Sequence, residues 1–177
     1  MARTTSSTVT GACGFTTMEV LVALTIVAIL AALAVPSLSG FVNEQRLGST
    51  MGQLVNDLHF ARTEAIKRNS RVLLCARQAG STACAAVPDW SNGWLVCYDA
   101  NSDDQCDASG AADPNPMKVA NRLPDTLQLA SVAAFVRFNP IGTSSGTTTL
   151  NLAGTWTGST SRTGTVATTG AVSSRKN

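Results

Sequence analysis

The sequence predicts an α+β fold in which one long N-terminal helix precedes an antiparallel, β-rich head. Two patterns indicate this. An apolar run near the N-terminus continues into a stripe with helical spacing, and the remainder consists of short, partly alternating runs separated by Gly-, Pro- and Asp-rich turns. A length of 177 residues leaves room for one ordinary domain plus an extension. The net charge of +2 gives no reason to expect a nucleic-acid partner from composition alone.

The first element is the apolar run over residues 20–38, VLVALTIVAILAALAVPSL. As a helix it would be roughly 28 Å long, close to the thickness of the hydrocarbon core of a bilayer. The apolar region of a cleaved secretory signal is shorter, at about 7–15 residues. We therefore expect a retained transmembrane helix over residues 15–38.

The second element is an amphipathic stem helix over residues 39–69, ending at Asn69–Ser70. Its apolar positions recur at intervals of three and four, as the buried face of a helix requires. His59, the only histidine, lies beside this stripe and is interpreted as a packed or surface residue, not a catalyst. The stripe consists of Leu47, Met51, Leu54, Leu58, Ala61 and Ala65.

The third element is the head, residues 70–177, in which several segments have the composition of half-buried antiparallel strands. The predicted strands are residues 71–75, 93–99, 117–123, 133–140, 147–152 and 164–169.

A motif at the start of the apolar run narrows the interpretation. Gly14 and Phe15 stand shortly before Glu19, and the apolar run ends near Pro36. Together these residues resemble the class III signal of type IV prepilins. The resemblance implies that residues 1–14 are a leader, that prepilin peptidase cuts between Gly14 and Phe15, and that the new N-terminus at Phe15 is methylated. The leader departs from the pattern in having Arg3 as its only basic residue.

The same resemblance assigns Glu19 and Pro36 to subunit assembly. The carboxylate of Glu19 would neutralise the Phe15 amine of a neighbouring subunit, since an uncompensated charge in an apolar filament core costs several kcal/mol. The alternative is a simple signal anchor in which Glu19 reaches the membrane interface.

Cysteine usage in the head indicates disulfides. Cys13 lies in the leader, which leaves an even set of four cysteines in a domain expected to be exported. Four cysteines allow three connectivities. We predict Cys75–Cys84 and Cys97–Cys106, because each pair brackets a short polar loop between predicted strands. Free buried thiols are the alternative.

Three blocks of sequence make the resemblance more specific. Residues 61–75, 89–101 and 136–143 are similar to the GspH/FimT/FimU branch of minor pilins and pseudopilins. That branch implies a long N-terminal helix, a β-sandwich-like head and a low-abundance subunit that primes or caps a filament. It also implies that Gly93 and Trp94 start a strand with a packing aromatic, and that Gly142 is a turn glycine.

The sequence contains weak candidates for a calcium site and for a DNA contact. Asp99, Asn101 and Asp103 have the spacing of the first three calcium ligands of a calcium loop, but the later positions fail, so a solvated hairpin tip is preferred and no metal site is predicted. Some FimT relatives bind DNA through a basic C-terminal motif. Here the corresponding stretch, residues 162–167, lacks both arginines that should follow Gly164. Arg162, Arg175 and Lys176 remain as weak candidates for DNA contact.

We therefore expect a minor pilin of a type IV pilus, with no cofactor and no enzymatic activity. Its expected partners are prepilin peptidase, the inner membrane, other minor pilins and the major pilin. The head would lie in the periplasm before the subunit enters the pilus. The alternatives are an H-type minor pseudopilin of a type II secretion system, placed in a pseudopilus, and a DNA-binding pilus receptor for natural transformation.

Overall fold

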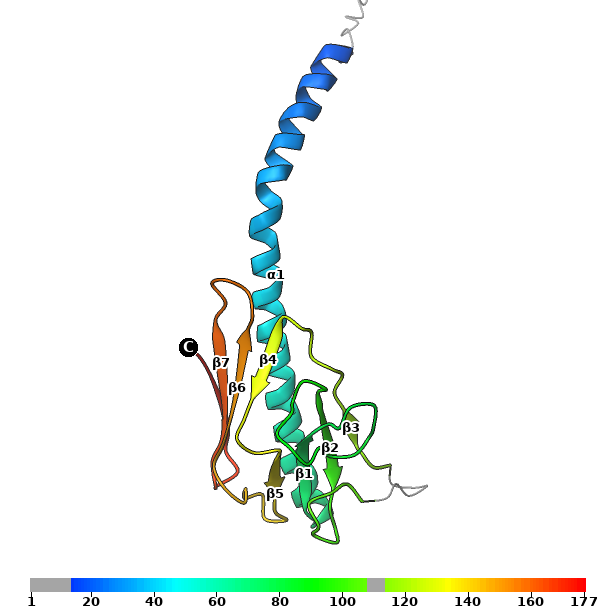
Figure 1. Cartoon of the computed structure of the whole chain (residues 1–177), viewed down its shortest axis with the longest axis vertical. Helices are drawn as coiled ribbons and strands as arrows, with labels where there is room; N and C mark the ends of the chain where they lie inside the picture. Colours follow the sequence, from blue (N-terminus) through cyan, green and yellow to red (C-terminus); the bar gives the residue numbers. More distant parts are fainter. Residues whose placement is uncertain (1–13, 108–113) are drawn as a thin grey trace, which may run out of the picture. The chain divides into compact units, whose positions relative to one another are not determined.

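The computed structural model describes residues 14–107 and 114–177, without the side chains of residues 32–38. The chain forms two compact units, Met1–Ser39 and Gly40–Asn177. Helix α1, Thr17–Arg68, supplies residues to both. It is followed by strands that all belong to the second unit, which we call the head unit (Figure 1).

The C-terminal end of α1 is fixed by backbone hydrogen bonds. Asn69 adopts a left-handed conformation with φ of 49°, as is common for the residue after a helix. The amide of Asn69 donates to the Ile66 carbonyl at 3.3 Å, and the amide of Ser70 donates to the Ala65 carbonyl at 3.2 Å. These two bonds form a Schellman motif, so the helix ends where the Asn69–Ser70 pair predicted.

Two antiparallel four-stranded sheets form the rest of the head unit (Figure 1). The first sheet has the order β3-β2-β1-β5, with β1 at Val72–Ala76, β2 at Trp94–Tyr98, β3 at Lys118–Val119 and β5 at Phe135–Phe138. The second has the order β4-β6-β7-β8, with β4 at Leu127–Ala130, β6 at Thr148–Gly154, β7 at Ser161–Val166 and β8 at Val172–Lys176. The predicted α+β class is confirmed.

One apolar core joins the helix to both sheets. All six residues of the predicted stripe, from Leu47 to Ala65, are buried, each 2 % exposed or less. They share the core with Leu74 and Trp94 of the first sheet and with Leu150 and Leu152 of the second. The helix spacing therefore predicted the face of α1 that the head unit covers.

The central strands of the first sheet, β1 and β2, are buried on both faces. Side chains of β1 alternate between the main core and a second cluster, which contains Leu73, Leu95 and all four head cysteines. The predicted pairing is confirmed, since the structure forms Cys75–Cys84 and Cys97–Cys106. These bridges hold two loops over the outer face, and this explains why β1 and β2 have continuous apolar sequences instead of alternating ones.

The strand predictions were incomplete in the second sheet. Neither β4 nor β8 was predicted, and the strand predicted at 164–169 lies at Ser161–Val166. The chain turns after β7, where the amide of Gly170 donates to the Ala167 carbonyl at 2.8 Å. This turn ends β7 at Val166 and starts the return strand β8.

Candidate assembly segment and head surface

The predicted processing site lies immediately before α1. Gly14 and Phe15 are non-helical, and the Phe15 side chain is 81 % exposed. Thr16 caps the helix, because its Oγ1 accepts a hydrogen bond from the amide of Glu19 at 3.2 Å. Glu19 itself lies in the first helical turn, where a carboxylate favours the positive end of the helix dipole.

The helix after this cap is apolar on every side over residues 20–31 and is not covered by the described residues of its own chain. Its large side chains, including Leu21, Val27 and Leu30, are about half exposed or more. Thr25 is a polar exception, and its hydroxyl donates to the Val22 carbonyl at 2.7 Å. A helix that is apolar all round is stable when other apolar surfaces surround it. Within the part of the chain that the structure describes, no helix meets the length and hydropathy expected of a membrane span.

A buried carboxylate connects the helical part of the head unit to the first sheet. Asp57, 6 % exposed, accepts hydrogen bonds from Trp94 Nε1 at 2.9 Å and from Lys118 Nζ at 2.8 Å. The Lys118 ammonium also lies 4.2 Å from the centre of the Phe60 ring. These contacts of Asp57, which we call the Asp57 anchor, fix the strand β2 against α1.

The second sheet is attached to α1 by residues that include two of the candidate DNA contacts. Glu44 accepts a hydrogen bond from the Thr160 hydroxyl at 2.7 Å and pairs with Lys176 at 3.0 Å. The hydrogen bond from Thr160, and after it that from Lys176, lowers the pKa of Glu44. The guanidinium of Arg162 lies over Gly48, where an added Cβ would be 3.3 Å from its Nη2.

The remaining candidate DNA contact, Arg175, is exposed and donates to the Asn177 side chain at 3.3 Å. The structure thus places Arg175 at the surface of β8 and uses Arg162 and Lys176 in contacts with the helix. DNA contact stays a prediction.

In the loop considered as a calcium candidate, arginine side chains and backbone amides of the loop bind the aspartate carboxylates. Asp99 is fully buried, accepts the amides of Asp103 and Asp104 at 3.0 and 3.2 Å, and pairs with Arg71 at 3.3 Å. Asp104 lies between Arg71 and Arg137 and pairs with both. The oxygens of Asp99 therefore already have charged and polar partners, and Asp99 is buried instead of lying at the solvated tip that was expected.

Two glycines of the similar blocks occupy positions that require glycine. Gly93 has φ of +83°, and a Cβ there would overlap the backbone carbonyl oxygens of Ala120 and Asn121. Gly142 has φ of +79° and donates its amide to the Asn139 carbonyl at 2.8 Å, as a turn residue does. Trp94, directly after Gly93, is the buried aromatic that packs in the core.

Sequence reasoning missed the Thr16 cap and the Asp57 anchor. The Thr16-x-x-Glu19 spacing is that of a capping box, a signal that was present in the sequence. Asp57 is a polar residue next to Leu58 of the stripe, at a position where the helix faces the core. His59 is exposed, as expected for a surface residue.

Comparison with known proteins identifies the family. Residues 50–170 match the family described as type II transport protein GspH. The chain belongs to this family. Two crystal structures of the type IV minor pilin FimU from Pseudomonas aeruginosa strain PAO1 have the same fold at 18 % sequence identity. One, in space group P21, has a TM-score of 0.55 over 75 % of this chain and 90 % of FimU. The other, in space group P65, has a TM-score of 0.54 over 73 % and 92 %.

No curated protein matches the chain in sequence. Membership of the GspH family confirms the expected minor pilin or pseudopilin type, and proteins of these types are structural, not enzymatic. They act by associating with other pilins in a pilus or pseudopilus.

Proposed function

We propose that this GspH-family chain is a minor pilin that acts structurally in the priming or tip complex of a type IV pilus. The observation that carries the proposal is the helical segment over residues 20–31, which follows Glu19 and is apolar on every side. It belongs to the same chain as a folded, disulfide-bonded head. Such a segment is buried only by lipid or by the helices of other subunits. The likeness of fold to FimU is consistent with the pilus.

Processing would begin with cleavage between Gly14 and Phe15 and methylation of the new amine of Phe15. The positions of these residues support this step, because both lie outside the helix and are exposed to an enzyme. Helical hydrogen bonding would not have to be broken, since the helix starts at Thr17.

Assembly would then use Glu19 as the selective contact. The amine of Phe15 is cationic, and an apolar filament core makes an unpaired charge costly. A Glu19 carboxylate from a neighbouring subunit removes that cost in one register only, since a shift along the helix separates the charges. The subunit would wait in the inner membrane with its head in the periplasm, in contact with prepilin peptidase, and would then join other minor pilins and the major pilin.

The test is a strain that lacks this chain, complemented with the wild-type gene and scored for surface pili, twitching and secreted proteins. We expect loss of pili and twitching with normal secretion. A second pair of strains separates assembly from folding. Glu19→Ala should leave the protein level unchanged but fail to restore pili, whereas Asp125→Ala, at a head carboxylate 90 % exposed, should restore them.

The second candidate function is that of an H-type minor pseudopilin of a type II secretion system. It is favoured by the GspH match over residues 50–170. Loss of secretion with normal piliation in the same strain would establish this function in place of the first. A role as a DNA receptor has less support, since Arg162 and Lys176 contact α1. A gel shift with no retardation of DNA at low salt would reject it.

A further inference from the structure

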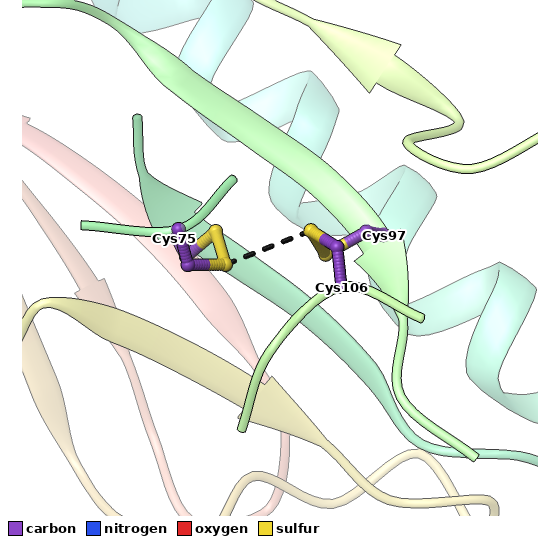
Figure 2. Close-up of side chains that lie close together, drawn as sticks. Cys75, Cys97 and Cys106 are labelled. Carbon is purple, nitrogen blue, oxygen red and sulfur yellow. Dashed lines mark hydrogen bonds between the residues drawn. A yellow bond between two sulfur atoms is a disulfide. The ribbon is translucent and has the colours of Figure 1, made fainter. Parts of the chain in front are cut away.

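The two disulfides lie against each other on the outer face of the first sheet. Cys75 of β1 and Cys97 of β2 are two positions apart in the antiparallel register, since Cys75 pairs with Leu95 and Leu73 pairs with Cys97. They therefore point to the same face. Cys84 Sγ lies 3.6 Å from Cys106 Sγ, which belongs to the other bridge. Figure 2 shows the two bridges facing each other, with Cys75, Cys97 and Cys106 labelled. All four sulfurs lie within 4.8 Å of one another.

The four cysteines differ in their exposure to solvent. Cys75 and Cys97 are fully buried in strands, whereas Cys84 is 6 % exposed and Cys106 is partly exposed. Cys84 also lines an open hollow of about 360 Å³ together with Gln78 and Gln105. Cys84 and Cys106 are therefore the cysteines of the cluster through which a thiol from solvent approaches most directly.

A separation of 3.6 Å is van der Waals contact between sulfur atoms, the distance from which a thiolate attacks a disulfide. The apolar cluster around the bridges, including Leu73 and Phe135, holds these atoms in place. Groups held in contact in this way react as if at very high concentration. Exchange between the two bridges should therefore be much faster than reaction of either bridge with a second molecule.

We propose that the four cysteines form a single disulfide-exchange site, entered at Cys84 or Cys106 by the thiol of a protein dithiol or of a small dithiol. The external thiolate bonds to Cys84, and Cys75 leaves as a thiolate and takes a proton. The second thiol of the dithiol then forms its own internal disulfide and releases Cys84 as a thiolate.

The next step is internal to the chain. The Cys84 thiolate attacks Cys106 Sγ, a Cys84–Cys106 bond forms, and Cys97 leaves as a thiolate and takes a proton. The dithiol supplies two electrons in the first stage, and the internal exchange transfers none. The product has one bridge between the two surface loops and two buried thiols, Cys75 and Cys97.

Two variants that remove the same bridge test this proposal. In the full chain with Cys13→Ser, Cys75→Ser leaves Cys84 free in contact with Cys106, whereas Cys84→Ser leaves the buried Cys75 free. Each variant is held at mildly alkaline pH, unfolded in acid, alkylated, digested without reduction and mapped by mass spectrometry. We expect Cys84–Cys106 peptides in Cys75→Ser, with at least severalfold more alkylation of Cys97 than in Cys84→Ser.

The proposal is wrong if Cys75→Ser retains only Cys97–Cys106, or if Cys84→Ser exchanges to the same extent. Partial reduction of the chain with all four head cysteines intact gives a second measurement that does not depend on how the variants fold. With substoichiometric dithiothreitol, we expect a species with Cys84–Cys106 bonded and Cys75 and Cys97 both alkylated. Loss of the two native bridges independently, without this species, would overturn the exchange site.

Discussion

Replacing Asp57 with alanine is expected to lower the free energy of unfolding of the head unit by about 1–4 kcal/mol. The largest contribution comes from Trp94, which is 2 % exposed and whose indole N–H donates to Asp57 at 2.9 Å. Without the carboxylate this donor is buried and unpaired, at a cost of about 1–3 kcal/mol. Lys118 is 40 % exposed and can be solvated, so the loss of its ion pair adds only about 0–1 kcal/mol.

The assay is urea unfolding of the full chain in mild detergent, followed by far-UV circular dichroism so that loss of Trp94 does not remove the signal. Asp57→Asn is the matched variant. Its amide oxygen can still accept the Trp94 N–H, so we expect it to cost about 1 kcal/mol. A double-mutant cycle isolates the pair. In a Trp94→Phe background no donor is left unpaired, and Asp57→Ala should cost at least about 1 kcal/mol less than it does in the wild type.

Equal costs of Asp57→Ala in the two backgrounds would refute this reasoning. A cost below about 0.5 kcal/mol in the wild-type background would do the same, because it would mean that Trp94 finds another acceptor or water. In either case Asp57 could not be the residue that fixes β2 against the helix.

Two further predictions concern charge and backbone conformation in the head unit. The hydrogen bond from Arg68, at 2.8 Å, lowers the pKa of Glu64 below its usual 4.5 against the opposing effect of burial. The ionised Glu64 therefore stabilises the native state, fully above about pH 4.5 and progressively less as the pH falls through the lowered native pKa. In a plot of unfolding free energy against pH, Glu64→Gln should therefore lose less stability at acid pH than the wild type. Gly170→Ala should lower the melting temperature far more than Gly80→Ala, measured by thermal unfolding. Both glycines have positive φ, but a Cβ at Gly170 would overlap the Gly142 carbonyl oxygen, whereas a Cβ at Gly80 meets no atom within 4 Å.

The sequence predicted those parts of the fold in which side-chain burial follows a simple period. The stem stripe was predicted because every third or fourth residue from Leu47 to Ala65 faces one core. The strands β1 and β2 were predicted as half-buried strands between turn residues, whereas their apolar runs are continuous. The reason for that continuity, a second cluster closed by disulfides, follows from the cysteine spacing only when the loops are known to fold over the outer face.

The strand β8 could not be predicted from burial, because it has little. Its residues Val172–Lys176 are mostly exposed, and its place in the sheet depends on backbone hydrogen bonds to β7. The sequence VSSRK has no apolar alternation, so its pattern is typical of a polar tail. The contact between Glu44 and Lys176 links residues far apart in the chain and was likewise beyond local patterns.

The residues of the candidate site also differ in whether a local sequence pattern points to them. Gly14, Phe15 and Glu19 form a linear motif, and the roles proposed for them come from the resemblance of this motif to the prepilin signal. Asp57 acts through partners in strands β2 and β3, and no sequence pattern brings those partners together.

The two halves of α1 differ in whether the described residues of the chain cover their apolar side chains, and this difference bears on the proposed assembly. From Leu47 onward one stripe is enough, because two sheets of the same chain cover it. Over residues 20–31 the helix is apolar on every side and its side chains are exposed, so under the proposed function lipid or other subunits would bury them. Lipid tails are as apolar as leucine, and apolar contacts alone therefore give little preference for one neighbouring helix over lipid. A charge in that setting is costly unless it is paired. Under the proposed function, Glu19 would thus contribute selectivity of register, and the apolar residues around it would contribute the surface along which subunits pack.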